Sequence, residues 1–456
     1  MKGQYISAIK RSSGKTTLSI AITRLLVERG LKVKTFKKGP DFIDPMWLTA
    51  ASKSQCFNLD FFFHNNIKEY FYRKIENADF IIIESNHGLF DDIGVNGKRS
   101  NASLAKLLDL PVILVVDVSE FGRSIIPVIQ GVINFDRELK FSGIVLNRVK
   151  SKRHETKLIN NIRKYINIQI IGSVPEDPKI TIEQRHLGLS SCLTSDEMNK
   201  KIELLSNRIK PFVSIDKIIL SANKIKKFYI LKGGEKLQYR NITYKKKVGI
   251  CFDRAFNFYY PENLNNIIKS GGKLIYISPL NDYDIPEIDC LYIGGGFPEN
   301  FANILEKNYK FKEKLRYLIE NGMPLYAECG GLIYLTDELI IGDQKYKMLG
   351  VIKARAIFQK KPIAHGYSLL KKISNNMNNL PTISKGHEFH HIYLDDFEED
   401  YDYLYKVIRG KGIKDGFDGI IYKNVIASFT HIYDSSKYGS FFEHWLNFDY
   451  NLSKSF

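Results

Sequence analysis

A lysine and two threonines at the start of a predicted helix give the first indication of chemistry. Residues 10–17 read KRSSGKTT and follow a short apolar segment, and residues 18–28 have a helical pattern. A tight turn at a helix N-terminus points backbone N–H groups at phosphate, a lysine adds positive charge, and a threonine hydroxyl binds Mg²⁺. The segment therefore predicts a nucleotide-binding loop. Its candidate binding residues are Lys10, Gly14, Lys15, Thr16 and Thr17.

Acidic residues follow two further predicted strands. Asp41 and Asp44 lie in the segment FKKGPDFIDP, and Glu84 ends an apolar run. Mg²⁺ prefers carboxylate and hydroxyl oxygens, and the strand ends are where a triphosphate would lie. The sequence therefore predicts that Thr16, Asp41 and Glu84 hold Mg²⁺. Taken singly, turn formation also explains the two aspartates, and a helix cap explains the glutamate.

A cysteine followed by two glycines marks a second chemical site. Residues 328–332, ECGGL, follow a predicted strand and precede a helical stretch. A cysteine on a sharp strand-to-helix turn is accessible, and we expect the helix N-terminus to lower the pKa of its thiol. Cys329 is thus the candidate nucleophile, and His431, just after a later predicted strand, is the candidate base. Gly295 and Gly296 can offer backbone N–H groups to an oxyanion.

Other histidines and cysteines have simpler explanations. His387, His390 and His391 have a spacing that allows metal binding, but they lack cysteine or carboxylate partners at known ligand spacing, so we assign no metal to them. The five cysteines contain no C-x-x-C pair. This argues against a disulfide framework or a zinc site and fits a reducing compartment.

The elements that must position these residues are predicted to form two α/β domains. Short β-branched apolar runs alternate with helical segments up to about residue 189, which indicates a doubly wound parallel sheet. A second alternating series begins at residue 248. We predict a P-loop domain at 1–190, a helical and Lys-rich connection at 191–246, and a second α/β domain at 247–446.

The composition excludes several classes of protein. With 44 % hydrophobic and 26 % charged residues among 456, the chain is neither disordered nor fibrous. No run approaches the roughly 18 apolar residues of a membrane span, and the N-terminus lacks a signal-peptide pattern, so we predict a cytoplasmic protein without a membrane partner. The net charge of +17 comes largely from scattered lysines. It favours a solvated basic surface over nucleic-acid binding, and it also suits a polyanionic small substrate.

The order of the motifs resembles that of the cobyrinate a,c-diamide synthases. These are glutamine-dependent amidotransferases that convert two side-chain carboxylates of a corrin precursor to amides. The resemblance covers nearly the whole chain. The matching segments are 14–17 (GKTT), 38–45 (KGPDFIDP), 58–60 (NLD), 88–91 (GLFD), 146–149 (LNRV), 185–189 (RHLGL), 253–261 (DRAFNFYYP), 295–299 (GGFPE), 327–331 (AECGG) and 386–390 (GHEFH).

The resemblance implies a P-loop, ATP-dependent amide synthetase domain followed by a class I-like glutaminase domain. It implies ATP and Mg²⁺ as cofactors, and a tetrapyrrole polycarboxylate and glutamine as substrates. It assigns Cys329 as nucleophile, His431 as its base and Asn147 as the adenine-reading asparagine, with no third acid in the glutaminase triad. A homodimer is compatible with the sequence, which sets no oligomeric state.

Departures from the family pattern leave the substrate open. Segments 36–48 and 86–89 resemble the branch associated with amidating sirohaem, and relatives acting on hydrogenobyrinate or nickel sirohydrochlorin share the chemistry. From another class, the Lys10-containing loop also resembles partitioning ATPases that bind DNA or membrane, but this leaves Cys329 and the second domain unexplained. A third option is a protein whose altered loop no longer binds ATP. The departures are Ala8 and Ser12 near the loop, Ser85 and Asp92 after the third predicted strand, and Tyr433.

Overall fold

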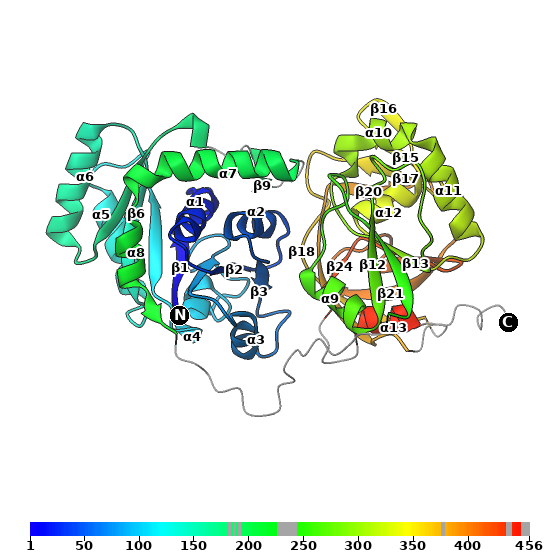
Figure 1. Cartoon of the computed structure of the whole chain (residues 1–456), viewed down its shortest axis with the longest axis horizontal. Coiled ribbons are helices and arrows are strands. Elements are labelled where there is room, and N and C mark those ends of the chain that lie inside the picture. The colour runs from blue at the N-terminus through cyan, green and yellow to red at the C-terminus, as the bar shows by residue number, and fades with distance from the viewer. Residues whose placement is uncertain are drawn as a thin grey trace. The chain divides into compact units, whose positions relative to one another are not determined.

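The chain forms two compact units, Met1–Gly234 and Glu235–Phe456, in a computed structural model (Figure 1). The structure describes residues 1–180, 184–185, 188–189, 193–225, 244–374, 379–434 and 440–447. The predicted connection at 191–246 and the motif at 185–189 lie partly outside the described residues.

A parallel sheet forms the centre of the first unit, with strand order β3-β2-β4-β1-β5-β6-β7 and with β10 antiparallel beside β1. Every residue of β5 is buried, because helices cover both faces of the sheet. The predicted doubly wound parallel sheet is confirmed. The strands are β1 (Lys2–Ala8), β2 (Val33–Lys38), β3 (Phe57–Leu59), β4 (Phe80–Glu84), β5 (Val112–Asp117), β6 (Phe141–Val149), β7 (Ile170–Pro175) and β10 (Asn223–Lys224), with a separate pair, β8 (Gln184–Arg185) and β9 (Gly188–Leu189).

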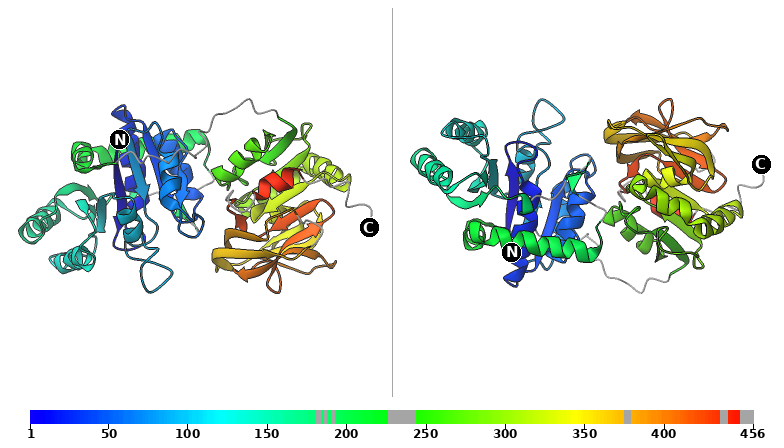
Figure 2. Two further views of the ribbon diagram at one scale, coloured as in Figure 1. Left: turned by 90° about the horizontal axis from the view of Figure 1, so that it is seen from below. Right: turned by 90° about the horizontal axis from the view of Figure 1, so that it is seen from above.

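Helices pack on both faces of this sheet. Alternate strand residues such as Tyr5, Ile81 and Leu114 share one core with α3 to α6. Figure 1 shows α7 running across α1 and α2, and Figure 2 shows it on the face opposite α5 and α6. The helices are α1 (Lys15–Glu28), α2 (Ile43–Ser52), α3 (Ile67–Lys74), α4 (Asn101–Leu107), α5 (Ile125–Phe135), α6 (Lys152–Tyr165), α7 (Ser195–Ile209) and α8 (Ile215–Ser221), with 3₁₀ turns at Pro178–Ile180 and Lys210–Phe212.

A ten-stranded mixed sheet forms the centre of the second unit, in the order β12-β11-β13-β14-β23-β22-β21-β18-β19-β24. The first five strands are parallel and the others antiparallel. Its strands are β11 (Lys246–Cys251), β12 (Gly272–Ile277), β13 (Cys290–Ile293), β14 (Leu325–Glu328), β18 (Ala364–Lys372), β19 (Ile383–His390), β21 (Asp402–Arg409), β22 (Phe417–Tyr422), β23 (Val425–Ser428) and β24 (His431–Ile432).

A four-stranded sheet in the order β16-β15-β17-β20 and several helices complete the second unit. The aromatic rings of Tyr292, Tyr326 and Trp445 belong to its core. In the described part of the chain, no helix has both the length and the apolar character that a membrane span requires. The remaining elements are β15 (Thr336–Ile341), β16 (Gln344–Lys347), β17 (Ile352–Phe358), β20 (Ile392–Asp395), α9 (Pro261–Lys269), a 3₁₀ turn (Pro298–Phe301), α10 (Ala302–Lys307), α11 (Tyr309–Glu320), α12 (Gly330–Leu335) and α13 (Phe441–Asn447).

Candidate functional site

The predicted nucleotide-binding loop connects β1 to α1. Gly14 has a φ of +87°, and a Cβ on it would lie 2.2 Å from the Nδ2 atom of Asn147. Asn147 Nδ2 donates a hydrogen bond of 2.8 Å to the carbonyl oxygen of Ser13. Asn147 therefore braces the loop at the one position where glycine is required by both space and conformation. Its predicted contact with adenine stays a prediction.

The other loop residues surround the N-terminus of α1. Ser12, which stands in place of a usual glycine, has a φ of +57°, a conformation that costs a side-chain-bearing residue about 1 kcal/mol. Lys10 is exposed, and its carbonyl oxygen accepts from Ser13 Oγ. Lys15 is buried, and burial together with Lys37 lowers its pKa to about 8. Thr17 is half-buried in the first turn of α1. A bound phosphate would offset the poorly compensated charge of Lys15.

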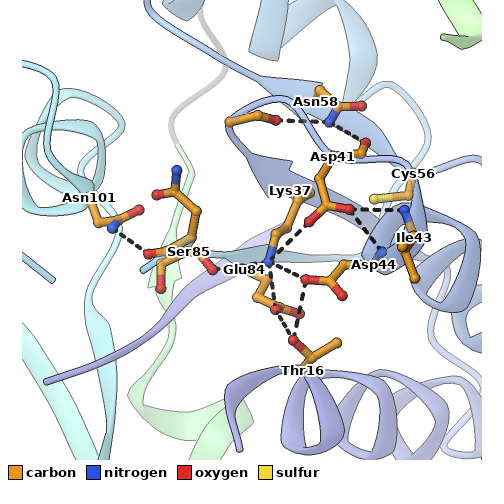
Figure 3. A network of polar contacts seen from close by, with 12 residues as sticks. Thr16, Lys37, Asp41, Ile43, Asp44, Cys56, Asn58, Glu84, Ser85 and Asn101 are labelled. Atoms are coloured by element: carbon orange, nitrogen blue, oxygen red, sulfur yellow. Dashed lines mark hydrogen bonds and ion pairs between the residues drawn. The ribbon is translucent and has the colours of Figure 1, made fainter. Parts of the chain in front are cut away.

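A cluster of polar side chains lies beside the loop, where β2 and β4 end (Figure 3). Thr16 Oγ1 donates to Glu84 Oε1 at 2.6 Å and lies 3.3 Å from Asp44 Oδ2. Lys37 Nζ donates to Asp44 Oδ2 and, at 2.9 Å, to Glu84 Oε1. The structure thus brings Thr16 and Glu84 together as predicted from the sequence, and it adds Lys37 and Asp44 to them.

The residues of this cluster fit Mg²⁺. Glu84 Oε2 is buried and has no hydrogen-bond partner within the described residues. Burial raises the pKa of Glu84 although Lys37 opposes the shift, so a cation that replaced the proton would relieve the cost of burying this carboxylate. Hydroxyl and carboxylate oxygens are the ligands that Mg²⁺ prefers. Thr16, Asp44 and Glu84 supply them here.

Asp41, the other predicted metal ligand, lies at the edge of the cluster. Its Oδ1 atom accepts from the backbone N–H groups of Ile43 and Asp44 at 2.9 and 3.2 Å, which caps the first turn of α2. Its Oδ2 atom lies 3.9 Å from Lys37 Nζ. Sequence reasoning placed both aspartates in this segment, with turn formation as the alternative for each, and selected Asp41 rather than Asp44 as a metal ligand. Lys37 was missed because a lysine in a strand carries no signal of its own.

The predicted nucleophile, Cys329, lies at a strained turn between β14 and α12. Its φ is +47° and its ψ is −99°, and its backbone N–H donates to the Ser428 carbonyl oxygen at 2.7 Å. A Cβ on Gly331 would lie 2.4 Å from the Ile293 carbonyl oxygen, so this glycine lets the turn pack against the end of β13. Backbone strain of this kind, costing roughly 1–3 kcal/mol, is common at reactive residues.

The expected lowering of the thiol pKa is wrong for this structure. Burial raises the pKa of Cys329 well above its ordinary value, and Glu299 raises it further. The backbone N–H of Gly330 opposes the shift but does not outweigh burial. The resting residue is therefore a thiol, and it needs a base that accepts its proton.

The predicted base, His431, packs on the segment around Gly295, and this segment also contacts Gly330, the residue after Cys329. A Cβ on Gly295 would lie 2.1 Å from His431 Cε1, so the imidazole packs directly on the backbone of the predicted oxyanion segment. A Cβ on Gly330 would lie 2.9 Å from the backbone nitrogen of Gly296. Burial lowers the pKa of His431 to about 3, and the positive charge that His390 carries when protonated makes a smaller contribution in the same direction. The imidazole is therefore neutral near pH 7.

A buried glutamate, Glu328, precedes the predicted nucleophile in the chain and lies near the predicted base, and sequence reasoning assigned it no role. Its Oε2 atom lies 3.8 Å from His431 Nδ1, which is too long for a hydrogen bond. The hydroxyls of Tyr292 and Tyr326 donate to its carboxylate at 2.7 and 2.9 Å, and the backbone N–H of Ile432 donates at 2.9 Å. Burial raises the pKa of Glu328 to about 7. Glu328 thus ties the segment that carries the base to β14.

The three histidines that are close in sequence, His387, His390 and His391, have different ring neighbours in the structure. His387 pairs with His431 across β19 and β24, and the two rings stack with centroids 5.0 Å apart. His390 stacks on Phe429 at 4.0 Å, and His391 stacks on Phe358. No three histidine, cysteine or acidic side chains of the described residues form a metal-binding group. His387 thus lies beside the predicted base, His431, a position that its sequence motif did not indicate.

Comparisons with known proteins cover both units. Residues 5–189 match the family described as the CobQ/CobB/MinD/ParA nucleotide binding domain, and residues 247–438 match the CobB/CobQ-like glutamine amidotransferase domain. The cobyrinate a,c-diamide synthase of Magnetococcus marinus is 35 % identical over 446 residues, which cover 94 % of this chain and 93 % of that protein. The chain belongs to the cobyrinate a,c-diamide synthase family.

Relatives of the same name extend across bacteria and archaea. The cobyrinate a,c-diamide synthase of Methanosarcina barkeri is 34 % identical, with 94 % of this chain and 92 % of that protein covered. The one from Caldanaerobacter subterraneus subsp. tengcongensis is 35 % identical, with 94 % of both chains covered. The present family member is thus an enzyme of the glutamine amidotransferase type with a nucleotide-binding domain, and the resemblance inferred from its motifs is confirmed.

Proposed function

We propose that this enzyme uses ATP and glutamine to convert the a and c side-chain carboxylates of cobyrinate, or of a related tetrapyrrole, to amides. The observation that carries the proposal is the presence of two different chemical sites in one chain. A threonine hydroxyl and buried carboxylates lie beside a phosphate-binding loop in the first unit, and a strained cysteine lies beside a neutral imidazole in the second. Sirohaem, hydrogenobyrinate and nickel sirohydrochlorin are the alternative acceptors.

In this proposal the second unit, through the domain predicted at 247–446, releases ammonia from glutamine. His431 takes the proton of the Cys329 thiol as the sulfur attacks the side-chain amide carbon. The backbone N–H groups of Gly295 and Gly296 hold the resulting oxyanion. The imidazolium returns its proton to the departing nitrogen, ammonia leaves, and water hydrolyses the glutamyl thioester.

The first unit, through the domain predicted at 1–190, activates the acceptor in this proposal. A carboxylate is a poor electrophile and hydroxide a poor leaving group near pH 7, so a side-chain carboxylate takes the γ-phosphoryl group of ATP before ammonia displaces phosphate. Lys15 and the N-terminus of α1 bind the phosphates. Thr16, Asp44 and Glu84 would hold Mg²⁺, with Asp41 nearby, and the ion would neutralise charge that develops on the transferred group.

Replacement of the nucleophile tests the division of labour. Cys329→Ala should abolish amide formation from glutamine and leave amide formation from ammonium salts, because only the first unit is then needed. Products are detected by mass spectrometry after incubation with Mg-ATP and, in parallel, cobyrinate, hydrogenobyrinate, sirohaem or nickel sirohydrochlorin. Cys290→Ala, which removes another buried thiol of the same unit, should retain both activities. Loss of both activities in Cys329→Ala, or no amide on any acceptor with the unaltered enzyme, would refute the proposal.

A further inference from the structure

Three loops converge at the carboxyl ends of β1, β4 and β2, which are neighbours in the sheet. A Cβ on Gly39 would lie 2.8 Å from Asn86 Nδ2, so the end of β2 touches the loop after β4. A Cβ on Gly88 would lie 2.6 Å from the Ile9 carbonyl oxygen, so the loop after β4 also touches the start of the nucleotide loop. Side chains from all three loops therefore share one region.

Lys38 is a buried cation in this region. It ends β2 and is only 6 % exposed. Unlike Lys37, which bonds to Asp44 and Glu84, Lys38 makes no hydrogen bond or ion pair with any residue that the structure describes. Burial lowers its pKa, and the carboxylates of Asp60, Asp92 and Asp91 oppose that shift incompletely. An anion placed against Lys38 would restore the interactions that its ammonium group lost on folding.

His87 adds a hydrogen-bond donor, and the structure indicates which ring nitrogen carries its proton. Its Nε2 atom lies 3.1 Å from the Arg11 guanidinium. A guanidinium only donates, so Nε2 accepts and the ring proton lies on Nδ1. Burial, Arg11 and Lys38 lower the pKa of His87 to about 4, while Asp91 opposes the shift. His87 is therefore neutral near pH 7 and carries its proton on Nδ1, and both Arg11 and Lys38 influence it electrostatically. Its φ of +38° is unusual for a residue with a side chain.

We propose that Lys38, His87 and Arg11 form a binding site for a carboxylate of the acceptor. This assignment rests on the proposed function, because it names the residues that recognise the polycarboxylate. β4 separates β2 from β1, so the two strands are roughly 10 Å apart at the usual spacing within a sheet. Lys38 is accordingly offset from the loop that binds the phosphates, and Asp91 faces both Lys38 and Lys15. For Lys38 this offset favours a second anion over the triphosphate itself, whereas Arg11 belongs to the predicted nucleotide-binding loop.

The test compares two substitutions on one strand. Lys38→Met removes the buried charge, and Lys34→Met makes the same change four residues earlier in β2. Binding of cobyrinate and of Mg-ATP to the full-length protein is measured separately by titration. Lys38→Met should weaken cobyrinate binding about tenfold, the usual scale for a hydrogen bond to a charged group, and leave Mg-ATP binding within about twofold. Lys34→Met should change neither affinity.

Arg11→Gln provides a second variant, at an exposed residue where folding is not at risk. It should also weaken cobyrinate binding. Unchanged cobyrinate affinity in both Lys38→Met and Arg11→Gln would overturn the proposal, as would an equal loss of Mg-ATP affinity, which would assign these residues to phosphate. Absence of binding by the unaltered protein to cobyrinate and to the three alternative tetrapyrroles would also overturn it. Failure of the proposed function would give a different result from failure of this site. The unaltered protein would bind cobyrinate but would form no amide.

Discussion

Substitution of Gly295 by alanine should disable glutamine hydrolysis, because it displaces the imidazole of the proposed base, His431. The new Cβ would lie 2.1 Å from His431 Cε1, whereas ordinary contact begins at 3.4 Å, so the imidazole must move by about 1.3 Å. Misplacing a catalytic group by about 1 Å can lower the rate roughly 100-fold, which corresponds to about 2.7 kcal/mol of activation free energy. His431 is buried, with 2 % of its surface exposed, so the displaced ring would press on neighbouring protein atoms rather than move into solvent.

The assay follows glutamate release for glutaminase activity, and amide formation from ammonium salts for the first unit. Gly295→Ala should lower kcat/KM for glutamine about 100-fold and leave the ammonia-dependent reaction unchanged. Gly131→Ala is the matched control, because its added methyl group meets nothing within 4 Å. If Gly295→Ala retained more than about a tenth of glutaminase activity, the position assigned to His431 would be refuted.

Two further substitutions test the geometry of each unit. Gly14→Ala should weaken Mg-ATP binding at least about tenfold, because φ of +87° is unfavourable for alanine and the Cβ displaces Asn147; unchanged binding by titration would contradict this. An unfolded glutamate ionises near pH 4.5 but Glu328 has a pKa of about 7, so the stabilisation from its protonated form is lost as pH rises between these values. The deficit in melting temperature of Glu328→Gln should therefore be smaller at pH 8 than at pH 5, and an equal or larger deficit at pH 8 would exclude the raised pKa.

Local sequence determined much about this protein. A phosphate-binding loop depends on a strand, a turn and a helix that are consecutive in the chain, so residues 10–17 indicated it directly. Cys329 was equally recognisable, because the strand, the reactive residue and the following glycines are contiguous. The doubly wound sheet followed from continuous apolar strands, since burial on both faces leaves no alternation of polar residues.

Contacts between distant segments were decided only by the tertiary structure. Whether Asp41 or Asp44 lies nearer to Thr16 depends on how α2 begins, and the capping of its first turn by Asp41 left Asp44 beside the threonine. The pKa of Cys329 depends on the balance between burial and the nearby helix end, and burial prevailed.

The unpartnered charge of Lys38 likewise appears only when β1, β4 and β2 are assembled. A strand sequence specifies which side chains are buried, but the partners that a buried charge finds there come from other strands. The sequence by itself therefore indicated most of the candidate groups of the two sites and the elements on which they lie, but not Lys37 or Glu328. The tertiary structure decided their distances and ionisation, because both depend on neighbours that are remote in the chain.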